Sequence, residues 1–329
     1  MKKRIEEIIQ ERILVVDGAM GTMIQKHSLT EEQYRGERFK EYPHLVKGNN
    51  DLLSITQPQI IEEIHNQFLS AGADIIETNT FNSNSISMED YHMSDLVDEL
   101  NRESVKIARK CADHWSTDDK PRFVAGSIGP TNKTLSLSPD VNNPGFRSVT
   151  FEDLRRCYSQ QAKTMIEEGV DLLLVETVFD TLNCKAALFA ISEIKEELGS
   201  DVPVMVSGTI TDASGRTLSG QTVESFWISV SHADLLSVGL NCALGASQMR
   251  PYIEELSRVS DSNISCYPNA GLPNEFGEYD DTPDNMASVL ESWAKEGFLN
   301  IVGGCCGTTP NHIREISNRV AGIAPRKKG

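Results

Sequence analysis

The chain has 329 residues, with 48 acidic residues against 31 basic ones and a formal net charge of −17 at pH 7. So negative a chain is not expected to bind nucleic acid or an anionic lipid surface. Hydrophobic residues make up 39% of the chain, which supplies a large core and excludes a disordered protein. No apolar run approaches the roughly 20 residues that span a bilayer, and the N-terminus lacks a signal-peptide core.

The seven cysteines are an odd number, and two of them, Cys305 and Cys306, are adjacent. This pattern is not that of an extracellular disulfide framework, so we expect reduced thiols and a cytoplasmic protein.

In chain order, residues 2–12 predict an amphipathic helix, and short strands that are apolar along their whole length follow. Continuous apolarity is typical of strands buried on both faces, which occur in parallel sheets. The eight runs are Ile13–Val16, Ile75–Asn79, Phe123–Gly126, Leu172–Val175, Val204–Ser207, Val238–Cys242, Ile264–Tyr267 and Ile301–Gly304.

Helical patterns lie between these runs. The segment 58–70 begins with Pro58, places Ile60, Ile64 and Phe68 on one stripe and ends before Gly72. Similar patterns predict helices near 95–113, 151–168, 181–197, 222–233, 247–258, 283–296 and 310–320.

Eight strand–helix units, spaced by about 41 residues, predict an α/β protein with a (β/α)8 TIM barrel. We expect a single barrel domain over 13–323, with a long first βα connection at 18–57. Residues 324–329 are expected to be a tail or the start of an inter-domain linker, with Arg326 in a solvated basic run. An open doubly wound sheet is the alternative, but no Gly-x-Gly-x-x-Gly follows the first strand.

Polar residues and thiols follow the strands at their carboxyl ends, where barrels of this class place catalysis. They are Asp17, Glu77, Asn79, Glu176, Asn241, Cys242, Asn269, Cys305 and Cys306. Because Cys242 ends strand six and the adjacent cysteines follow strand eight, three thiols are expected at one rim.

Three thiols at one rim are typical of zinc, and three protein ligands with one exchangeable position are the catalytic pattern. A phosphate-binding glycine loop after strand eight and ordinary core cysteines are the alternatives. The remaining cysteines are expected to be small buried hydrophobes, on helices at Cys111, Cys157 and Cys184 and inside strand seven at Cys266. The helix-borne His65 and His312 have no partner at i, i+4 and are expected to be ordinary histidines.

The charge of such a site indicates its chemistry. Three thiolates on Zn²⁺ leave a net charge of −1, so the metal would be a poor Lewis acid for activating water. A fourth thiol would still bind as a nucleophilic thiolate. These properties favour alkyl transfer onto sulfur over hydrolysis.

Several long motifs carry a resemblance that covers residues 12–326. The chain resembles the N-terminal homocysteine-binding module of cobalamin-dependent methionine synthase, in the homocysteine S-methyltransferase family. The motifs are Asp17–Gln25, Arg35–Phe39, Gly48–Asp51, Gly208–Gln221, Gly239–Cys242, Asn269–Asn274 and Gly303–Gly307.

The resemblance implies a zinc ion held by Cys242, Cys305 and Cys306, with Asn269 as a fourth ligand that homocysteine displaces. It also implies that Glu176 binds the ammonium of homocysteine. Asp17, with the backbone N–H groups of Gly18 and Ala19, would hold the amino-acid end. Glu77 and Asn79 are further candidates for substrate contact, with a structural role as the alternative.

The implied activity is methyl transfer to homocysteine, giving methionine. The donor would be methylcobalamin, resupplied by methyltetrahydrofolate, on cobalamin- and folate-binding modules of the same or a partner chain. A self-contained methyltransferase that uses S-methylmethionine or betaine is the alternative within the class. A non-catalytic interaction module stapled by zinc is the alternative of another class.

Overall fold

The strands of the computed structural model form one sheet in which every pairing is parallel. The structure describes residues 3–211, 214–275, 277 and 279–327. In chain order the strands are β1 (Leu14–Val15), β2 (Ile75–Glu77), β3 (Phe123–Ile128), β4 (Leu172–Val178), β5 (Val204–Gly208), β6 (Ser237–Gly245), β7 (Asn263–Asn269) and β8 (Ile301–Val302). Their spatial order, β1-β8-β7-β6-β5-β4-β3-β2, is that of a barrel opened between β1 and β2.

A bridge between Val16 and Ile75 closes that gap. The Asp17 N–H donates to the Ile75 carbonyl at 3.0 Å, and the Asp74 N–H donates to the Val15 carbonyl at 2.7 Å. The expected (β/α)8 barrel is therefore confirmed, and the open-sheet alternative is wrong.

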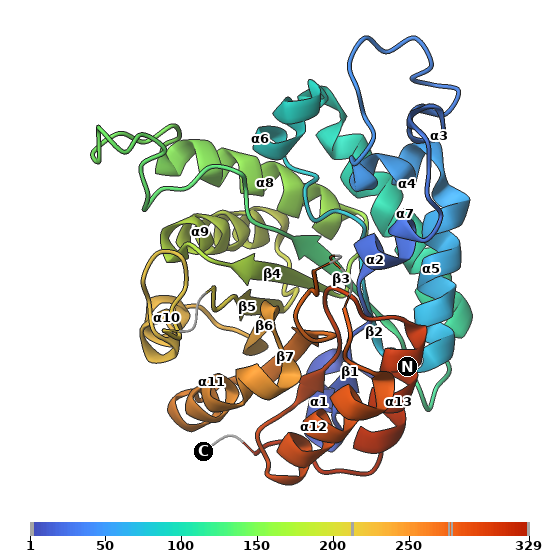
Figure 1. Cartoon of the computed structure of the whole chain (residues 1–329), viewed down its shortest axis with the longest axis vertical. Coiled ribbons are helices and arrows are strands. Elements are labelled where there is room, and N and C mark those ends of the chain that lie inside the picture. Colours follow the sequence, from blue (N-terminus) through green and yellow to red (C-terminus); the bar gives the residue numbers. More distant parts are fainter. Residues whose placement is uncertain (1–2, 212–213, 276, 278, 328–329) are drawn as a thin grey trace.

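Helices surround the strands (Figure 1). The outer helices are α5 (Pro58–Ala71), α7 (Val97–Trp115), α8 (Phe151–Glu167), α9 (Thr181–Leu198), α10 (Val223–Val230), α11 (Ala246–Val259), α12 (Pro283–Lys295) and α13 (Pro310–Val320). Several begin at capping side chains that the sequence supplies: Thr150 forms a capping box with Asp153, and the Asp180 carboxylate accepts from the Leu182 N–H. The expected helices all form, with ends displaced by a few residues.

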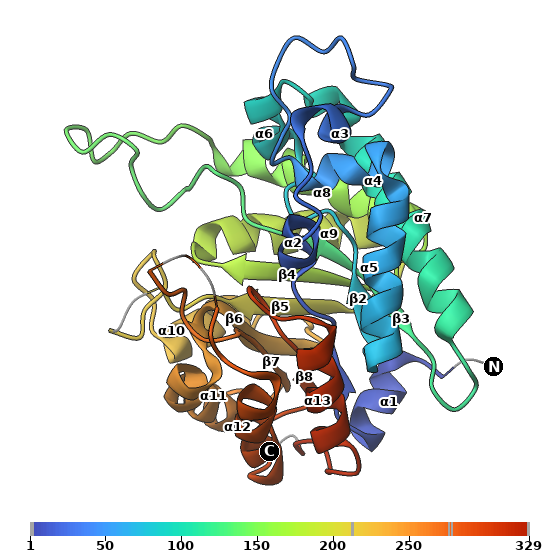
Figure 2. The same cartoon turned by 45° about the vertical axis from the view of Figure 1, so that its right-hand side comes forward.

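The first βα connection contains short helices that the sequence pattern does not predict. They are α2 (Met20–Gln25), α3 (Glu31–Arg35), the 3-10 helix η1 (Asn50–Leu52) and α4 (Leu53–Thr56). Between β2 and α7 lie α6 (Ser85–Met88) and the 3-10 helices η2 (Glu89–Tyr91) and η3 (Ser94–Leu96). Figure 2 shows the loop near residue 40, in blue, and the loop near residue 140, in green, extending beyond the barrel. Both follow strands, so both belong to the end of the barrel that carries the site.

Alternating residues of each strand point into the barrel, and their character changes along the strand. In β4, Leu172 and Leu174 belong to the apolar interior, and the next inward position is Glu176. At the other end, Ile5, Ile8 and Ile9 of α1 (Ile5–Glu11) pack into the same cluster and are at most 3% exposed. The barrel is therefore apolar at its base and polar at its mouth.

The C-terminal segment corrects one expectation. Arg326 is 7% exposed, and its guanidinium donates to the carbonyls of Ser257, Ser260 and Ser262 at 2.6–3.2 Å. Its own carbonyl accepts from Asn300 Nδ2 at 2.8 Å. The prediction of a solvated tail is wrong for Arg326, because this side chain satisfies backbone carbonyls at the base of the barrel.

Among the helices of the described residues, none is both long and apolar enough to cross a membrane.

Candidate active site

A cavity of about 340 Å³ lies at the carboxyl ends of the strands. The expected site residues that line it are Asp17, Gly18, Ala19, Glu77, Asn79, Glu176, Cys242, Cys305 and Cys306. Among the described residues that line this cavity there is no Lys, Arg or His, so its charged groups are carboxyls and thiols. Such a lining favours a cationic group on the ligand.

The three rim thiols converge as expected. The sulfurs of Cys242, Cys305 and Cys306 all lie within 4.8 Å of one another, and those of Cys242 and Cys306 are 3.8 Å apart. Tetrahedral zinc with Zn–S bonds of about 2.3 Å separates its sulfurs by about 3.8 Å. The residues present therefore fit a zinc ion, and among the described residues this is the one cluster of metal-binding side chains that converges in this way.

The backbone around the thiols is irregular. Cys242 and Ala243 have φ values of +61° and +59°, a left-handed conformation that is unusual for non-glycine residues. On the other side, Gly307 has φ +80°, and a Cβ there would lie 2.3 Å from the ring of Tyr279. The loop after β8 therefore needs glycine at this position in order to pass beneath Tyr279.

The thiols influence one another's protonation. Hydrogen bonds from Cys242 and Cys305, with a further one from Tyr279, lower the pKa of Cys306 to about 3. Hydrogen bonds with Cys242 and Cys306, together with burial, raise the pKa of Cys305 well above its ordinary value. The cluster thus holds one thiolate readily, as a soft-metal site requires.

Four carboxyl groups line the same cavity, those of Asp17, Asp51, Glu77 and Glu176. Glu176 is 4% exposed and accepts a hydrogen bond from Ser127 Oγ. Burial raises the pKa of Glu176 to about 7, and the charge of Cys306 adds to the increase. Burial also raises the pKa of Asp17 and of Glu77, and repulsion from Glu176 contributes to both shifts.

One oxygen of the Asp17 carboxyl group has no hydrogen-bond partner. Asp17 Oδ2 accepts from the Glu77 N–H at 3.2 Å, whereas Asp17 Oδ1 is buried with no hydrogen bond. A buried carboxylate oxygen without a donor is costly in a folded protein. An ammonium group in the cavity would satisfy it.

The first turn after β1 is tightly packed. A Cβ on Gly18 would lie 2.7 Å from the Phe68 ring and 2.8 Å from Thr308 Oγ1, so a larger residue cannot stand there. The Ala19 N–H, expected to face substrate, donates to Thr308 Oγ1 at 3.2 Å. In this structure the Ala19 N–H therefore forms its hydrogen bond within the protein and not toward the cavity.

Two of the predicted site residues, Asn79 and Asn269, do not offer a free side chain to the cavity. Asn79 lines the cavity, but its amide donates to the Asn50 carbonyl at 2.9 Å and to Ser54 Oγ at 3.1 Å, which favours the structural alternative. Asn269 ends β7 and is 3% exposed, and its Oδ1 is buried without a hydrogen-bond partner. It is not among the residues that line the cavity, so its role as a ligand stays a prediction.

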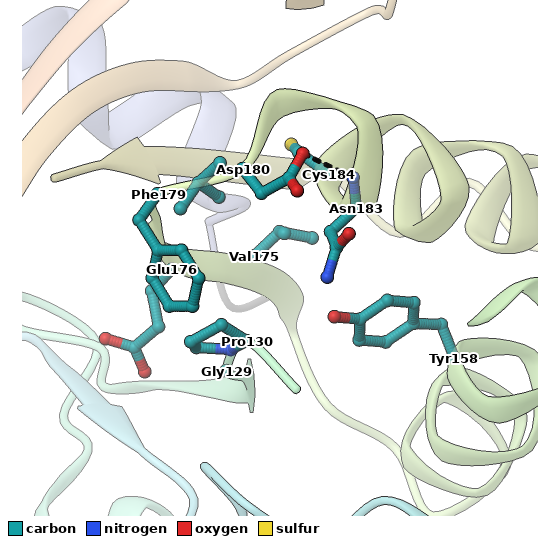
Figure 3. A pocket seen from close by; sticks show the side chains of 10 residues that line it. Gly129, Pro130, Tyr158, Val175, Glu176, Phe179, Asp180, Asn183 and Cys184 are labelled. Atoms are coloured by element: carbon teal, nitrogen blue, oxygen red, sulfur yellow. Dashed lines mark hydrogen bonds between the residues drawn. The ribbon is translucent and has the colours of Figure 1, made fainter. Parts of the chain in front are cut away.

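A much smaller cavity, of about 10 Å³, lies behind β4 (Figure 3). Figure 3 shows Tyr158, Asn183 and Cys184 on one side of it, with the carboxylate of Glu176 turned away from them. Asn183 donates to the Lys133 carbonyl at 2.8 Å and accepts from the Leu135 N–H at 3.0 Å. This second cavity belongs to the packing that supports β4.

The remaining cysteines and histidines lie away from the thiol cluster. Cys111, Cys157, Cys184 and Cys266 are buried in their helices and in β7, as expected. His312 belongs to the capping box at Thr309. His65 is buried in α5, where burial lowers its pKa to about 4 and keeps it neutral.

Among the residues that line the cavity, Ser127, Asp51, Tyr267 and Tyr279 are polar groups that the sequence did not indicate as site residues. The alternation of side chains along a strand could have indicated Ser127. It lies two positions after the inward-facing Ala125, just as Glu176 lies two positions after Leu174. The sequence pattern places Tyr267 in an apolar strand, yet its side chain belongs to the barrel interior and its hydroxyl is buried without a hydrogen-bond partner. Tyr279 lies on a loop, where no periodicity indicates its direction.

A family model, homocysteine S-methyltransferase, matches residues 14–320. The chain belongs to the homocysteine S-methyltransferase family. Its fold is similar to the homocysteine methyltransferase MmuM from Escherichia coli in its metallated form, with a TM-score of 0.73 and 20% identity over 95% of this chain and 98% of that one. The oxidized form of MmuM gives a TM-score of 0.72 and 18% identity, over 93% and 96% of the two chains. A complex of 2-naphthoyl-CoA reductase is more distant, at a TM-score of 0.51 and 12% identity, over 80% of this chain and 47% of that one.

Proposed function

We propose that this methyltransferase binds homocysteine as a thiolate on zinc held by Cys242, Cys305 and Cys306, and that its product is methionine. The observation that carries the proposal is the convergence of three thiols and four carboxyl groups on one cavity, among whose described lining residues there is no basic side chain. An aminothiol matches both halves of this site, because its sulfur suits the thiol cluster and its ammonium suits the carboxylates.

Different side chains bind the two ends of the substrate. Glu176, oriented by Ser127, meets the ammonium of the substrate, and Asp17 supplies its unpartnered oxygen to the same group. Zinc, when bound, lowers the pKa of a thiol that coordinates it and keeps that sulfur as a nucleophile. The sulfur then attacks the methyl carbon. The new S–CH3 bond forms as the bond from methyl to donor breaks, and the donor leaves with the electron pair of that bond.

Positioning supplies the remaining part of catalysis. Substrate held at both ends presents one sulfur lone pair toward the cavity mouth, which lowers the entropic cost of reaching the donor. The thiol proton departs on binding, so the transfer step needs no general base. Asn269, whose buried Oδ1 lacks a partner, fits a fourth ligand that the substrate sulfur replaces.

The donor we propose is methylcobalamin on another module, resupplied from methyltetrahydrofolate, with the protein acting as the homocysteine module of a methionine synthase. The long motifs Asp17–Gln25 and Gly208–Gln221 support this choice over S-methylmethionine or betaine. Turnover with S-methylmethionine in the absence of a corrinoid would contradict it and favour a self-contained enzyme.

X-ray absorption at the zinc edge, with and without homocysteine, tests the proposal. A change from three sulfur ligands plus one oxygen or nitrogen to four sulfur ligands is expected. An unchanged spectrum would favour a zinc-stapled module without catalysis.

A further inference from the structure

Asn241 connects the two halves of the site. It is fully buried, at 0% exposed, and immediately precedes Cys242 in β6. Its Oδ1 accepts from the Thr177 N–H at 3.1 Å, and its Nδ2 donates to Thr177 Oγ1 at 2.8 Å. Thr177 directly follows Glu176. Because β5 lies between β4 and β6, this pair of hydrogen bonds joins the ends of two strands that do not pair with each other.

The segments that Asn241 joins both have irregular backbone. Thr177 has φ +54°, and Cys242 and Ala243 have φ +61° and +59°. The register of β4 shifts between Val175 and Val178, and that of β6 shifts between Asn241 and Gly245. Left-handed conformations at non-glycine residues cost free energy and persist only where surrounding contacts hold them. The two hydrogen bonds of Asn241 are such contacts, and they hold both irregular segments at once.

A further contact reaches the metal-binding thiols. Asn241 Nδ2 lies 3.9 Å from Cys305 Sγ, and the Asn241 backbone carbonyl accepts from Thr209 Oγ1 at 2.9 Å. One amide side chain therefore contacts Thr177, next to Glu176 in β4, and one cysteine of the cluster, while its backbone leads directly into another cysteine.

We propose that Asn241 is a positioning residue that sets the spacing between the sulfur site and the ammonium site, and thereby selects the length of the aminothiol. This inference rests on the proposed function. Homocysteine has two methylene groups between its α-carbon and its sulfur, and cysteine has one. A spacing that is fixed for homocysteine cannot engage both ends of cysteine.

The first test compares the affinities of the zinc-loaded full chain for homocysteine and for cysteine, measured by calorimetry. Asn241→Ala is expected to lower the affinity for homocysteine at least about tenfold, because two buried hydrogen bonds are lost. The affinity for cysteine should change little. The preference for homocysteine then falls by the same factor, and zinc content stays near one per chain.

Asn300→Ala is the matched control. Asn300 is also 0% exposed, accepts from the Ile264 N–H at 2.9 Å and donates to the Arg326 carbonyl at 2.8 Å, at the base of the barrel. Its loss is expected to lower thermal stability and to leave the ratio of the two affinities unchanged. A purely structural role for Asn241 predicts the same behaviour for both variants.

A second variant keeps the proposal testable where Asn241→Ala folds poorly. Thr177→Val removes the Oγ1 acceptor and keeps the backbone N–H that donates to Asn241. It is expected to reduce the preference for homocysteine a few-fold. In the double variant, the combined loss should be smaller than the sum of the two separate losses, because both changes break one connection.

The outcomes separate the two proposals. Wild-type protein that binds zinc but not homocysteine contradicts the proposed function. Wild-type protein that binds homocysteine and cysteine equally, or variants at Asn241 and Thr177 that keep the wild-type ratio, overturn the inference and leave the proposed function standing.

Discussion

Ser127 Oγ donates a hydrogen bond to Glu176 Oε1, so that a side chain of β3 orients the carboxylate of β4. Both residues are buried and both stand at inward positions of their strands. The bond favours the ionised carboxylate, whereas burial favours the neutral acid, and the balance leaves the pKa of Glu176 at about 7. A cation placed beside Glu176 would therefore shift its protonation strongly toward the ionised carboxylate.

Glu176→Gln separates recognition of the amino acid from activation of the thiol. Because a charge-assisted contact is worth roughly 1.5–3 kcal/mol, homocysteine binding should weaken about ten- to a few-hundredfold. Zinc content should not change, and binding of 2-mercaptoethanol, which has no ammonium, should be almost unaffected. Calorimetry and metal analysis measure these quantities. Loss of zinc, or equal weakening of both thiols, would show that Glu176 supports the metal or the fold.

Ser127→Ala tests how the carboxylate is tuned. Without the Ser127 hydrogen bond, which lowers it, the pKa of Glu176 should rise above about 7. At pH 7 less of the carboxylate is then ionised, so homocysteine affinity should fall several-fold relative to wild type. The difference should narrow as the pH rises to about 8.5. A deficit that is independent of pH would assign Ser127 a packing role instead.

Metal removal should leave the barrel folded. Purified under reducing conditions, the chain should bind about one zinc ion, and Cys242→Ala, Cys305→Ala or Cys306→Ala should each weaken binding severely. An apolar core that surrounds every strand does not depend on one ion at the rim, so circular dichroism should survive chelation. Cys184→Ala, at a buried thiol outside the cluster, is the control and should keep its zinc.

Binding should release a proton. The thiol of free homocysteine is mostly protonated near pH 7, and coordination requires the thiolate. Calorimetric titrations in buffers of different ionisation enthalpy measure the number released. Zero net release would mean that the thiol does not coordinate the metal.

Asp51 should make stability depend on pH. Burial raises its pKa from 3.8 to about 6, although Asn82 and Ser83 donate hydrogen bonds to its Oδ1. The folded state therefore holds the proton more tightly than the unfolded state. This contribution to stability is full below about pH 3.8 and is lost as the pH rises through about 6.

Asp51→Asn keeps the acceptor oxygen and removes the titration. Between pH 4 and 6 the free energy of unfolding of wild type should decline relative to this variant, by up to about 1.4 kcal/mol per pH unit. Urea denaturation at several pH values measures the difference. The exposed Asp118→Asn is the control, and a variant at Asp51 that follows the wild-type curve would contradict the assignment.

The barrel itself was predictable because buried parallel strands are apolar on both faces, as in Leu172–Val175. The convergence of Cys242 with Cys305 and Cys306 followed from strand order alone. The left-handed backbone at Thr177 in β4 and the packing of Tyr279 over Gly307 could not be predicted, since they depend on contacts between segments distant in sequence. The burial of Arg326 could not be predicted for the same reason, because its partners are backbone carbonyls of a distant segment, which the residue types do not indicate.

The apolar residues of α1 make the barrel a cup with a single opening. Because Ile5, Ile8 and Ile9 fill its base, reactants and products must share the mouth. Under the proposed function, homocysteine would have to enter before a methyl carrier covers the opening, and methionine would leave only after that carrier withdraws. The closed base would thus impose an order on the proposed reaction, in which the spent carrier departs before methionine.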